Sequence, residues 1–269
     1  MSEKRNKEIT LSVGTLAYLA LPARGSLVPL HCTIVPVDHV ASMRAAESEV
    51  VEEVKNFKKC LIQMFQAQVC NAKLHTPRLF VAPQLCARPC KPILCDPFEG
   101  LSRLSQLGLL VQDKRCIFIE TATRVKEGRS HACVECVPVT QEAFSSAPMI
   151  LRREIDSAES EWSQHHAKRL IETTDRGLNS CIPSNFPYFH VEFGYKKGYV
   201  HVIDDEESWD RRFGRSVLAS LSGADTVEIY RRAQRDSATT QSVQKNGFLE
   251  AWQEFDWTKQ LEQADVQDE

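Results

Sequence analysis

The chain has 269 residues, of which 42% are hydrophobic and 26% are charged, and its formal net charge is -3. This composition is typical of a folded protein and excludes a chain that is disordered throughout. The net negative charge also argues against a protein that coats nucleic acid nonspecifically. Apolar runs such as Leu16–Pro22 are far shorter than the about 20 residues needed to cross a bilayer, and Met1–Lys7 lacks a signal-peptide core, so we expect an intracellular protein with no membrane partner.

Cysteines and basic residues are both clustered. Eight of the ten cysteines fall on predicted strands or inside one irregular segment, and together they form no evenly spaced framework, which predicts reduced thiols. Basic clusters persist in spite of the net charge, and most such clusters are simply solvated faces. They are Arg124/Lys126/Arg129, Arg152/Arg153, Arg211/Arg212/Arg215 and Arg231/Arg232/Arg235.

The first elements predicted along the chain are two strands and a helix. Alternating apolar residues in Ile9–Leu21, broken at Gly14, indicate strand structure, and Leu30–Val37 indicates another strand. In Glu47–Phe65 the apolar residues recur with helical spacing, which predicts an amphipathic helix lying on the sheet. Its apolar stripe consists of Val50, Val54, Phe57, Leu61, Met64 and Phe65.

An irregular segment follows the helix. Val69–Gln112 contains five prolines and four cysteines with little sustained periodicity, so we interpret it as an insertion or loop. A second interpretation is an untranslated intron carried into the gene sequence, in which case the spliced product joins Gln68 to Asp113.

Two further strands complete the first predicted unit. Cys116–Glu120 and His131–Val139 are strand-like and are joined by the basic loop Thr123–Ser130. Strand, strand, helix, strand, strand is typical of an α+β domain with a largely antiparallel sheet.

The pattern changes after Pro148, where helical spacing begins, and we place a domain boundary near Ala147. A hairpin and two helices are predicted downstream: strands Pro187–Gly194 and Gly198–Ile203, then helices near Arg211–Leu221 and Gln241–Trp257. The predicted units are residues 8–147 with an insertion at 69–112, a smaller α+β module at 148–258, and a disordered tail at 259–269.

The segment His131-Ala-Cys133-Val-Glu135 carries the strongest chemical pattern in the chain. Successive side chains of a strand alternate faces, so His131, Cys133 and Glu135 are predicted to project together.

This strand and the earlier one resemble the histidine-triad fold with two of the three histidines lost. The resemblance rests on Leu30-His31-Cys-Thr-Ile-Val-Pro36-Val-Asp-His39, the helix that follows it, and His131-x-Cys133-x-Glu135-x-Val-Pro138. The second unit resembles the C-terminal module of the CwfJ-like splicing factors. That resemblance rests on Glu161-Trp162-Ser163, Pro187-Tyr188-Phe189, Gly198–Ile203, Phe213-Gly214-Arg215 and Phe255-Asp256-Trp257-Thr258.

Within that family the chain is more similar to the CWF-nineteen-like protein two group, on the residues Cys116-Ile-Phe-Ile-Glu120-Thr121 and Glu135-Cys136-Val-Pro138. The resemblance implies a nuclear protein of late spliceosomes that hold the excised intron lariat, with a role in lariat handling or disassembly. The implied partners are late spliceosome proteins, intron-lariat RNA and the lariat-debranching enzyme.

The resemblance also bears on catalysis. Active histidine-triad enzymes attack phosphorus with the middle histidine, and Cys133 occupies that position here. A thiolate needs electropositive surroundings, whereas Glu135 on the same face raises the thiol pKa. We therefore expect no enzyme activity; the alternative is a nucleotide phosphodiesterase or hydrolase that uses Cys133 or His131.

Several residues are candidates for binding RNA or phosphate. His31, His39 and His131 are placed by the resemblance near the ancestral nucleotide pocket, and their alternative role is to satisfy hydrogen bonds at the sheet edge. On the predicted hairpin the candidates are Lys196, Lys197 and His201, because aromatic and basic side chains on one sheet can hold single-stranded bases. The alternative there is that the hairpin aromatics form core.

We expect no metal or other cofactor. The family generally carries a CxxC pair before the first strand as part of a zinc site, and this pair is absent here, as is the long polar N-terminal region, so the chain resembles a fragment or short form. A zinc site made of Cys86, Cys90, Cys95 and His75 is a weaker alternative, because structural zinc sites usually show tighter cysteine pairs.

Overall fold

A single antiparallel sheet forms the centre of the molecule. The computed structural model describes residues 6–74, 114–162, 170–173, 177–195, 197–224, 226 and 236–259. The strands are β1 (Thr10–Val13), β2 (Ala17–Ala20), β3 (Cys32–Pro36), β4 (Lys114–Ala122), β5 (Val134–Thr140), β6 (Ile171–Glu172), β7 (Tyr188–Phe193) and β8 (Lys197–Val202). They form one antiparallel sheet in the order β1-β2-β3-β5-β4-β7-β8-β6, which confirms the predicted α+β class.

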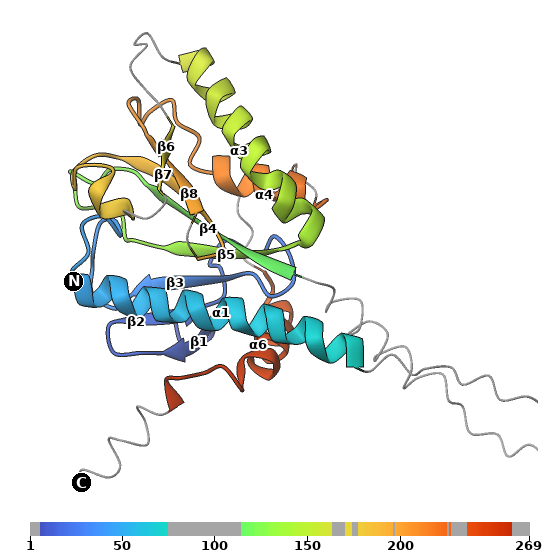
Figure 1. Cartoon of the computed structure of the whole chain (residues 1–269). Coiled ribbons are helices and arrows are strands. Elements are labelled where there is room, and N and C mark those ends of the chain that lie inside the picture. The colour runs from blue at the N-terminus through green and yellow to red at the C-terminus, as the bar shows by residue number, and fades with distance from the viewer. Residues whose placement is uncertain are drawn as a thin grey trace, which may run out of the picture.

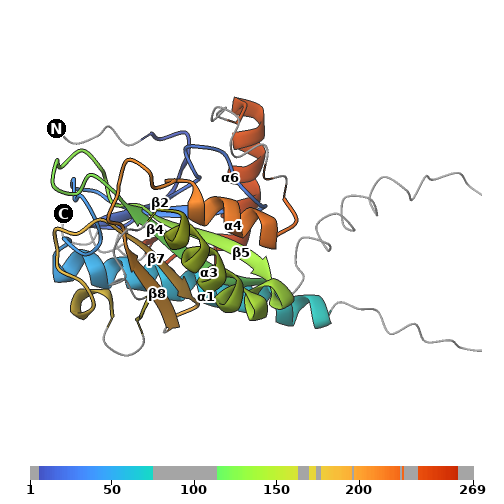
Figure 2. The ribbon, with the colours of Figure 1, turned by 90° about the horizontal axis from the view of Figure 1, so that it is seen from above.

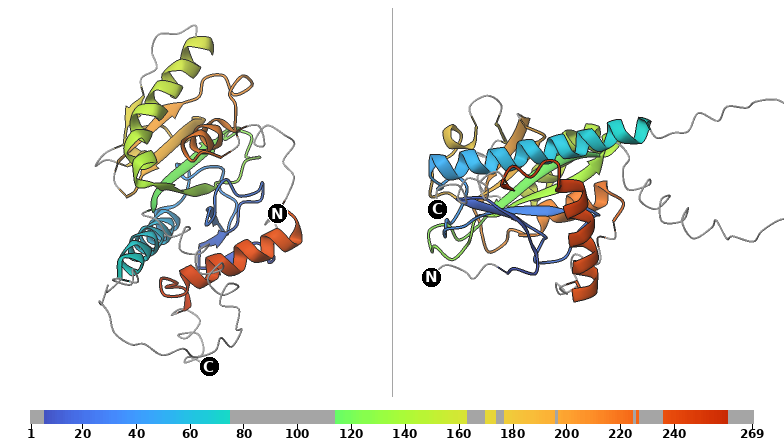
Figure 3. Two further views of the ribbon diagram at one scale, coloured as in Figure 1. Left: turned by 90° about the vertical axis from the view of Figure 1, so that its right-hand side faces the viewer. Right: turned by 90° about the horizontal axis from the view of Figure 1, so that it is seen from below.

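Helices cover both faces of this sheet. They are α1 (Ser48–Leu74), α3 (Gln141–Trp162), α4 (Phe213–Leu221), α6 (Ala238–Trp252) and the short 3-10 helix η1 (Leu178–Ser180). Helices α3 and α4 lie on one side of the strands, and α1 lies on the other (Figure 1, Figure 2). Helix α6 lies on the α1 side near β1, away from α3 (Figure 3).

The core under α1 confirms the predicted amphipathic stripe. All six stripe residues are buried, with Phe57, Leu61 and Met64 fully so. From Val54 onward they pack on the first three strands, on alternate residues of β4 and β5, and on Phe248 and Trp252 of α6. The α1 stripe therefore joins the two ends of the chain in one core.

A second core fills the opposite face. Ile117, Ile119, Val137 and Val139 point toward α3, whose Leu151 and Ile155 are fully buried against them. Both faces of β4 are thus covered, which explains why this strand is almost continuously apolar.

The turn between β1 and β2 contains a glycine because a side chain of α1 packs directly against its backbone. The carboxylate of Glu53 on α1 accepts hydrogen bonds from the backbone of Leu16 and Ala17, each at 2.9 Å. A Cβ atom at position 14 would collide with that carboxylate, so Gly14 is required there.

The two predicted units share this sheet. β4 from the first unit pairs along its length with β7 from the second, and the boundary predicted near Ala147 falls inside α3. The prediction that helix begins only after Pro148 was wrong. Thr140 accepts a hydrogen bond from the Ala143 amide, at 3.2 Å, and so caps the start of a helix that continues through the proline.

Two other bounds differ from those predicted. β5 begins at Val134 rather than His131, because Pro36 on the neighbouring strand has no amide hydrogen to extend the ladder, and the Ala132 amide donates instead to the Val40 carbonyl at 2.7 Å. Helix α6 begins at Ala238, where Ser237 accepts from the Thr240 amide at 3.1 Å. The predicted hairpin is confirmed, with Phe193 opposite Lys197.

Residues 69–74 extend α1, and the rest of the predicted insertion lies outside the described residues. The same holds for residues 260–269 of the predicted tail. Among the helices that are described, none has the length and apolar character to cross a bilayer.

Candidate functional site

A cleft opens on the α4 side of β5, and we call it the β5 cleft. Its volume is about 400 Å³. His131, Cys133 and Glu135 all line it, while Ala132, Val134 and Cys136 are buried on the opposite face. The predicted alternation is therefore present, although only Glu135 of the three lies within the strand itself. The other lining residues are Pro22, Ala23, Arg24, Thr33, Ile119, Thr121, Thr123, Arg129, Ser130, Arg211 and Arg215.

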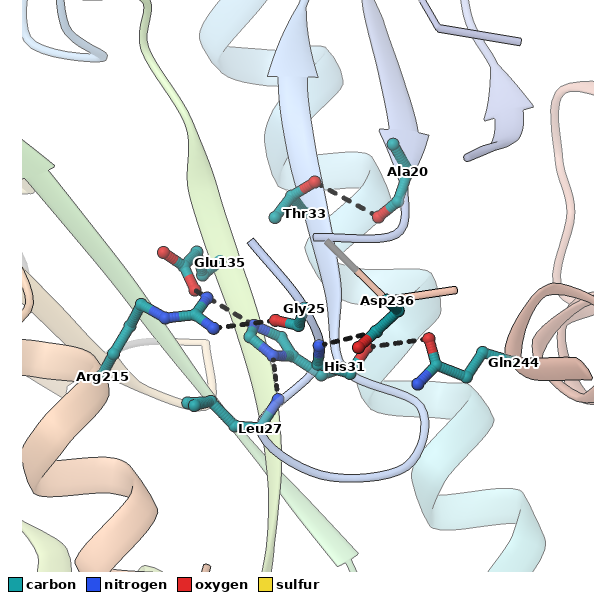
Figure 4. A network of polar contacts seen from close by, with 10 residues as sticks. Ala20, Gly25, Leu27, His31, Thr33, Glu135, Arg215, Asp236 and Gln244 are labelled. Carbon is teal, nitrogen blue, oxygen red and sulfur yellow. Dashed lines mark hydrogen bonds and ion pairs between the residues drawn. The ribbon is translucent and has the colours of Figure 1, made fainter. Parts of the chain in front are cut away.

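Glu135 is the centre of a network of polar contacts (Figure 4). Its Oε2 accepts a hydrogen bond from Arg215 Nη1 at 2.6 Å and lies 3.2 Å from His31 Nε2. Burial acts to raise the pKa of Glu135, but the hydrogen bond from His31 and the charge of Arg215 outweigh it and lower the pKa to about 2. Glu135 is therefore a carboxylate at all physiological pH values.

Arg215 also connects the cleft to the loop before β3. Its Nη2 donates to the carbonyl of Gly25 at 2.8 Å. Gly25 has φ +82°, a conformation that favours glycine, and a Cβ there would lie 3.3 Å from the Asp236 carboxylate. The next residue, Ser26, donates to Asp236 and to Gln244 of α6 (Figure 4). Helices α4 and α6 thus hold this loop in place.

His31 supports the network from behind. It is fully buried, and its Nδ1 accepts a hydrogen bond from the Leu27 amide at 3.1 Å. The proton of the neutral ring therefore lies on Nε2, facing the Glu135 carboxylate. The prediction that His31 contacts a phosphate requires an exposure that it lacks; in this structure it positions Glu135.

Cys133 is poorly suited to be a nucleophile. Burial raises its thiol pKa well above the usual range, Glu135 and Glu120 raise it further, and Arg215 and Arg24 oppose this only in part. The thiol therefore stays protonated at neutral pH, whereas attack on phosphorus requires the thiolate.

His131 and His39 lie next to each other at the end of the cleft. His131 Nε2 donates to the Pro36 carbonyl at 2.9 Å, and its Nδ1 is buried without a hydrogen-bond partner among the described residues. The His39 ring packs edge-on against it with centroids 5.2 Å apart, and His39 itself is exposed. Of the three candidate histidines, His131 alone lines the cleft and His39 lies beside it.

Arginines form the rim of the β5 cleft. Arg24, Arg129 and Arg211 are all exposed. Arg129 lies 3.6 Å from Glu127, whereas no ion pair or hydrogen bond to a described residue is found for Arg24 or Arg211. The rim can therefore offer two unpaired positive charges to an anion such as an RNA phosphate.

The hairpin candidates do not form a comparable surface. His201 is 4% exposed and packs on the Trp209 ring with centroids 5.1 Å apart, so the prediction of an RNA contact by this residue is corrected: it is a core residue here. Lys197 is exposed at the start of β8, and Lys196 lies outside the described residues.

In the part of the chain that is described, no group of three or more His, Cys, Asp or Glu side chains is arranged to hold a metal ion. The alternative zinc ligands His75, Cys86, Cys90 and Cys95 lie outside the described residues. Free thiols are found at Cys32, Cys60, Cys116, Cys133, Cys136 and Cys181.

Sequence reasoning did not foresee the part played by Arg215. Its basic cluster was noted, but the partner Glu135 lies 80 residues away and no local pattern joins them. The same is true of Glu120, a buried carboxylate on the face of β4 opposite the β5 cleft. In the sequence, Glu120 is distinguished locally only as a charged residue directly after the apolar residues Cys116–Ile119.

Comparisons with known proteins support the second resemblance. Residues 161–258 match the family described as "Protein similar to CwfJ C-terminus 2", and residues 1–74 match "Protein similar to CwfJ C-terminal". The chain is 26% identical to human CWF19-like protein 2 over 253 residues, which are 94% of this chain and 23% of that protein.

Two other relatives are similar over comparable lengths. Identity is 26% to pre-mRNA-splicing factor cwf19 of Schizosaccharomyces pombe, over 93% of this chain and 33% of the relative. It is 37% to mouse CWF19-like protein 1, over 96% of this chain and 38% of the relative. The chain thus spans less than half of each of these proteins. It carries matches to both CwfJ C-terminal modules, the first at residues 1–74 and the second at residues 161–258, and over most of its length it is similar to CWF19-like proteins.

Proposed function

We propose that this chain is a noncatalytic nuclear splicing factor, associated with post-splicing complexes that hold the excised intron lariat. In those complexes it aids lariat handling or disassembly, with late spliceosome proteins, intron-lariat RNA and the lariat-debranching enzyme as partners. Support for a splicing role comes from a relative whose name is pre-mRNA-splicing factor. Kinship with the histidine-triad enzymes stays a prediction.

The proposal that the chain is noncatalytic rests on the protonation of the Cys133 thiol. Burial and the charge of Glu135 raise the pKa of this thiol, and Arg215, the cation that most opposes this rise, is already paired with Glu135. Binding is better supported than catalysis, because the rim arginines Arg24 and Arg211 line the β5 cleft and pair with none of the described acidic residues.

Pull-down of tagged protein followed by RNA sequencing tests the role directly. The wild-type chain should recover intron lariats and late spliceosomal RNAs, and the double variant Arg24→Ala/Arg211→Ala should lose them. The matched control is Arg152→Ala/Arg153→Ala, which removes the same charge from exposed residues of α3 that pair with Glu172 and Glu154. Failure of the wild type to recover either class of RNA contradicts the proposal.

Two further measurements separate the alternatives. Crosslinking to RNA at the Arg124 loop distinguishes an RNA-binding protein from a scaffold that contacts protein alone. Incubation with an AMP conjugate and with a branched RNA should give no product; turnover that disappears in Cys133→Ser or His131→Ala would establish the phosphodiesterase alternative instead.

A further inference from the structure

A second cavity of about 420 Å³ lies on the face of the sheet opposite the β5 cleft, beneath the first turns of α1. We call it the α1 cavity. Phe118, Val134 and Val54 give it an apolar wall, while Glu120, His190 and Lys58 supply polar groups. None of these residues lines the β5 cleft. The volume falls within the range of small-molecule pockets and suits a single ring system better than a peptide.

The interior of the α1 cavity already contains its own cation. Lys58 Nζ lies 2.5 Å from Glu192 Oε2 and 5.4 Å from the centroid of the Phe118 ring. A cationic ligand would be attracted by the Glu192 carboxylate and by the Phe118 ring face, and Lys58 already occupies both of these positions. Two carboxylates, Glu120 and Glu192, disfavour an anion. The ligand that fits is therefore uncharged.

Hydrogen-bonding capacity nevertheless remains in the wall. Glu120 accepts from the Met43 amide at 2.8 Å and from the Tyr188 hydroxyl at 2.7 Å, which leaves further lone pairs on its two oxygens. Burial raises the pKa of Glu120 to about 7 and lowers that of His190 to about 4. The imidazole is thus neutral at physiological pH and presents polar edges without a charge.

The mouth of the cavity has a different character. Tyr195 is 43% exposed, and Lys59 Nζ lies 5.5 Å from the centroid of its ring. Lys55, one turn earlier on α1, also lines the cavity and is 42% exposed, and its Nζ pairs with the exposed carboxylate of Glu52 at 2.5 Å. Proteins that bind single-stranded nucleic acids use exposed aromatic rings to stack on bases and nearby lysines to contact phosphates.

We propose that the α1 cavity accepts one unstacked base of single-stranded RNA. A nucleobase is flat and uncharged, with apolar faces and a polar edge, and it matches the Phe118 wall and the edge groups of Glu120 and His190. Tyr195, which also lines the cavity, stacks on that same base at the mouth, and Lys55 and Lys59 face the phosphates. The inference rests on the proposed function, in that the chain must contact RNA.

The test compares two short fluorescently labelled strands bound by the full chain. One is a strand of abasic ribose phosphates that carries a single central 2-aminopurine, and the other is wholly abasic. Wild-type protein should bind the first about tenfold more tightly, as stacking of one base provides. The measured quantity is the ratio of the affinity for the 2-aminopurine strand to the affinity for the abasic strand. Val51→Phe fills the cavity and Tyr195→Ala removes an exposed ring at its mouth, so each should bring this ratio close to one without changing affinity for the abasic strand.

Controls make the outcomes distinguishable. Phe186→Ala removes an aromatic ring that is 46% exposed and lies away from the cavity, and it should leave the ratio unchanged. Arg211→Ala in the β5 cleft should weaken both strands equally. A ratio of one in the wild type, or a ratio that survives both Val51→Phe and Tyr195→Ala, overturns the α1 cavity proposal while RNA binding stands. No binding of either strand overturns both proposals.

Discussion

Replacing Glu135 by Gln tests whether the polar network of the β5 cleft stabilises the fold. The side chain is 22% exposed and pairs with Arg215, which is itself 10% exposed. Its pKa falls from the ordinary value of 4.5 to about 2. Since each pH unit between the folded and unfolded pKa corresponds to about 1.4 kcal/mol, ionised Glu135 contributes about 3 kcal/mol to the free energy of unfolding at neutral pH.

The sign of the pH dependence follows from the lowered pKa. The contribution is complete above the unfolded pKa and is lost as the pH falls from about 4.5 through about 2. Urea unfolding at pH 7 should show Glu135→Gln less stable than wild type by about 2 to 3 kcal/mol. At pH 3 the difference should shrink by about 2 kcal/mol, because wild-type Glu135 then keeps less than half of its advantage.

The matched control is Glu127→Gln, which removes an exposed carboxylate 3.6 Å from Arg129. Its side chain is 54% exposed, so it should change the free energy of unfolding by less than about 0.5 kcal/mol at either pH. A wild-type minus Glu135→Gln difference that stays constant between pH 7 and pH 3 would refute the reasoning, since it would mean that the charge of Glu135 makes no net contribution.

Three other predictions concern buried groups. Glu120 has a raised pKa of about 7, so wild type loses stability as the pH rises from about 4.5 through 7, and Glu120→Gln should gain about 2.5 kcal/mol relative to wild type between pH 5 and pH 9 in urea unfolding. Cys133 should react with iodoacetamide at pH 7.5 at least tenfold more slowly than Cys181, as measured by peptide mass spectrometry; equal rates would show that the thiol is not held protonated. Gly214→Ala places a Cβ 2.6 Å from the Phe189 ring, so thermal unfolding should show a loss of about 1 to 3 kcal/mol, and an unchanged melting temperature would contradict the tight seating of α4.

Local sequence patterns were sufficient to predict a helix or strand and its buried face wherever the apolar residues of that element recur with a regular spacing. The stripe from Val50 to Phe65 gave α1 its buried face, and alternation placed Cys133 and Glu135 in one cleft. Contacts between distant segments were not accessible in this way. The pairing of β4 with β7 and the contact of Arg215 with Glu135 join parts of the chain that no short window contains, and Thr140 outweighed Pro148 as the signal that sets the start of α3.

The β5 cleft depends on both predicted units, which has a consequence for any RNA contact. Arg24 comes from the loop before β3, whereas Arg211 precedes α4, so these two rim charges lie together only when α4 is seated on the sheet. Arg215 fixes that seating by joining Glu135 to the Gly25 carbonyl. Loss of the Arg215 contact should therefore weaken phosphate binding even though Arg215 itself is neutralised. The network that makes Cys133 inert is thus the same one that assembles a cationic rim above it.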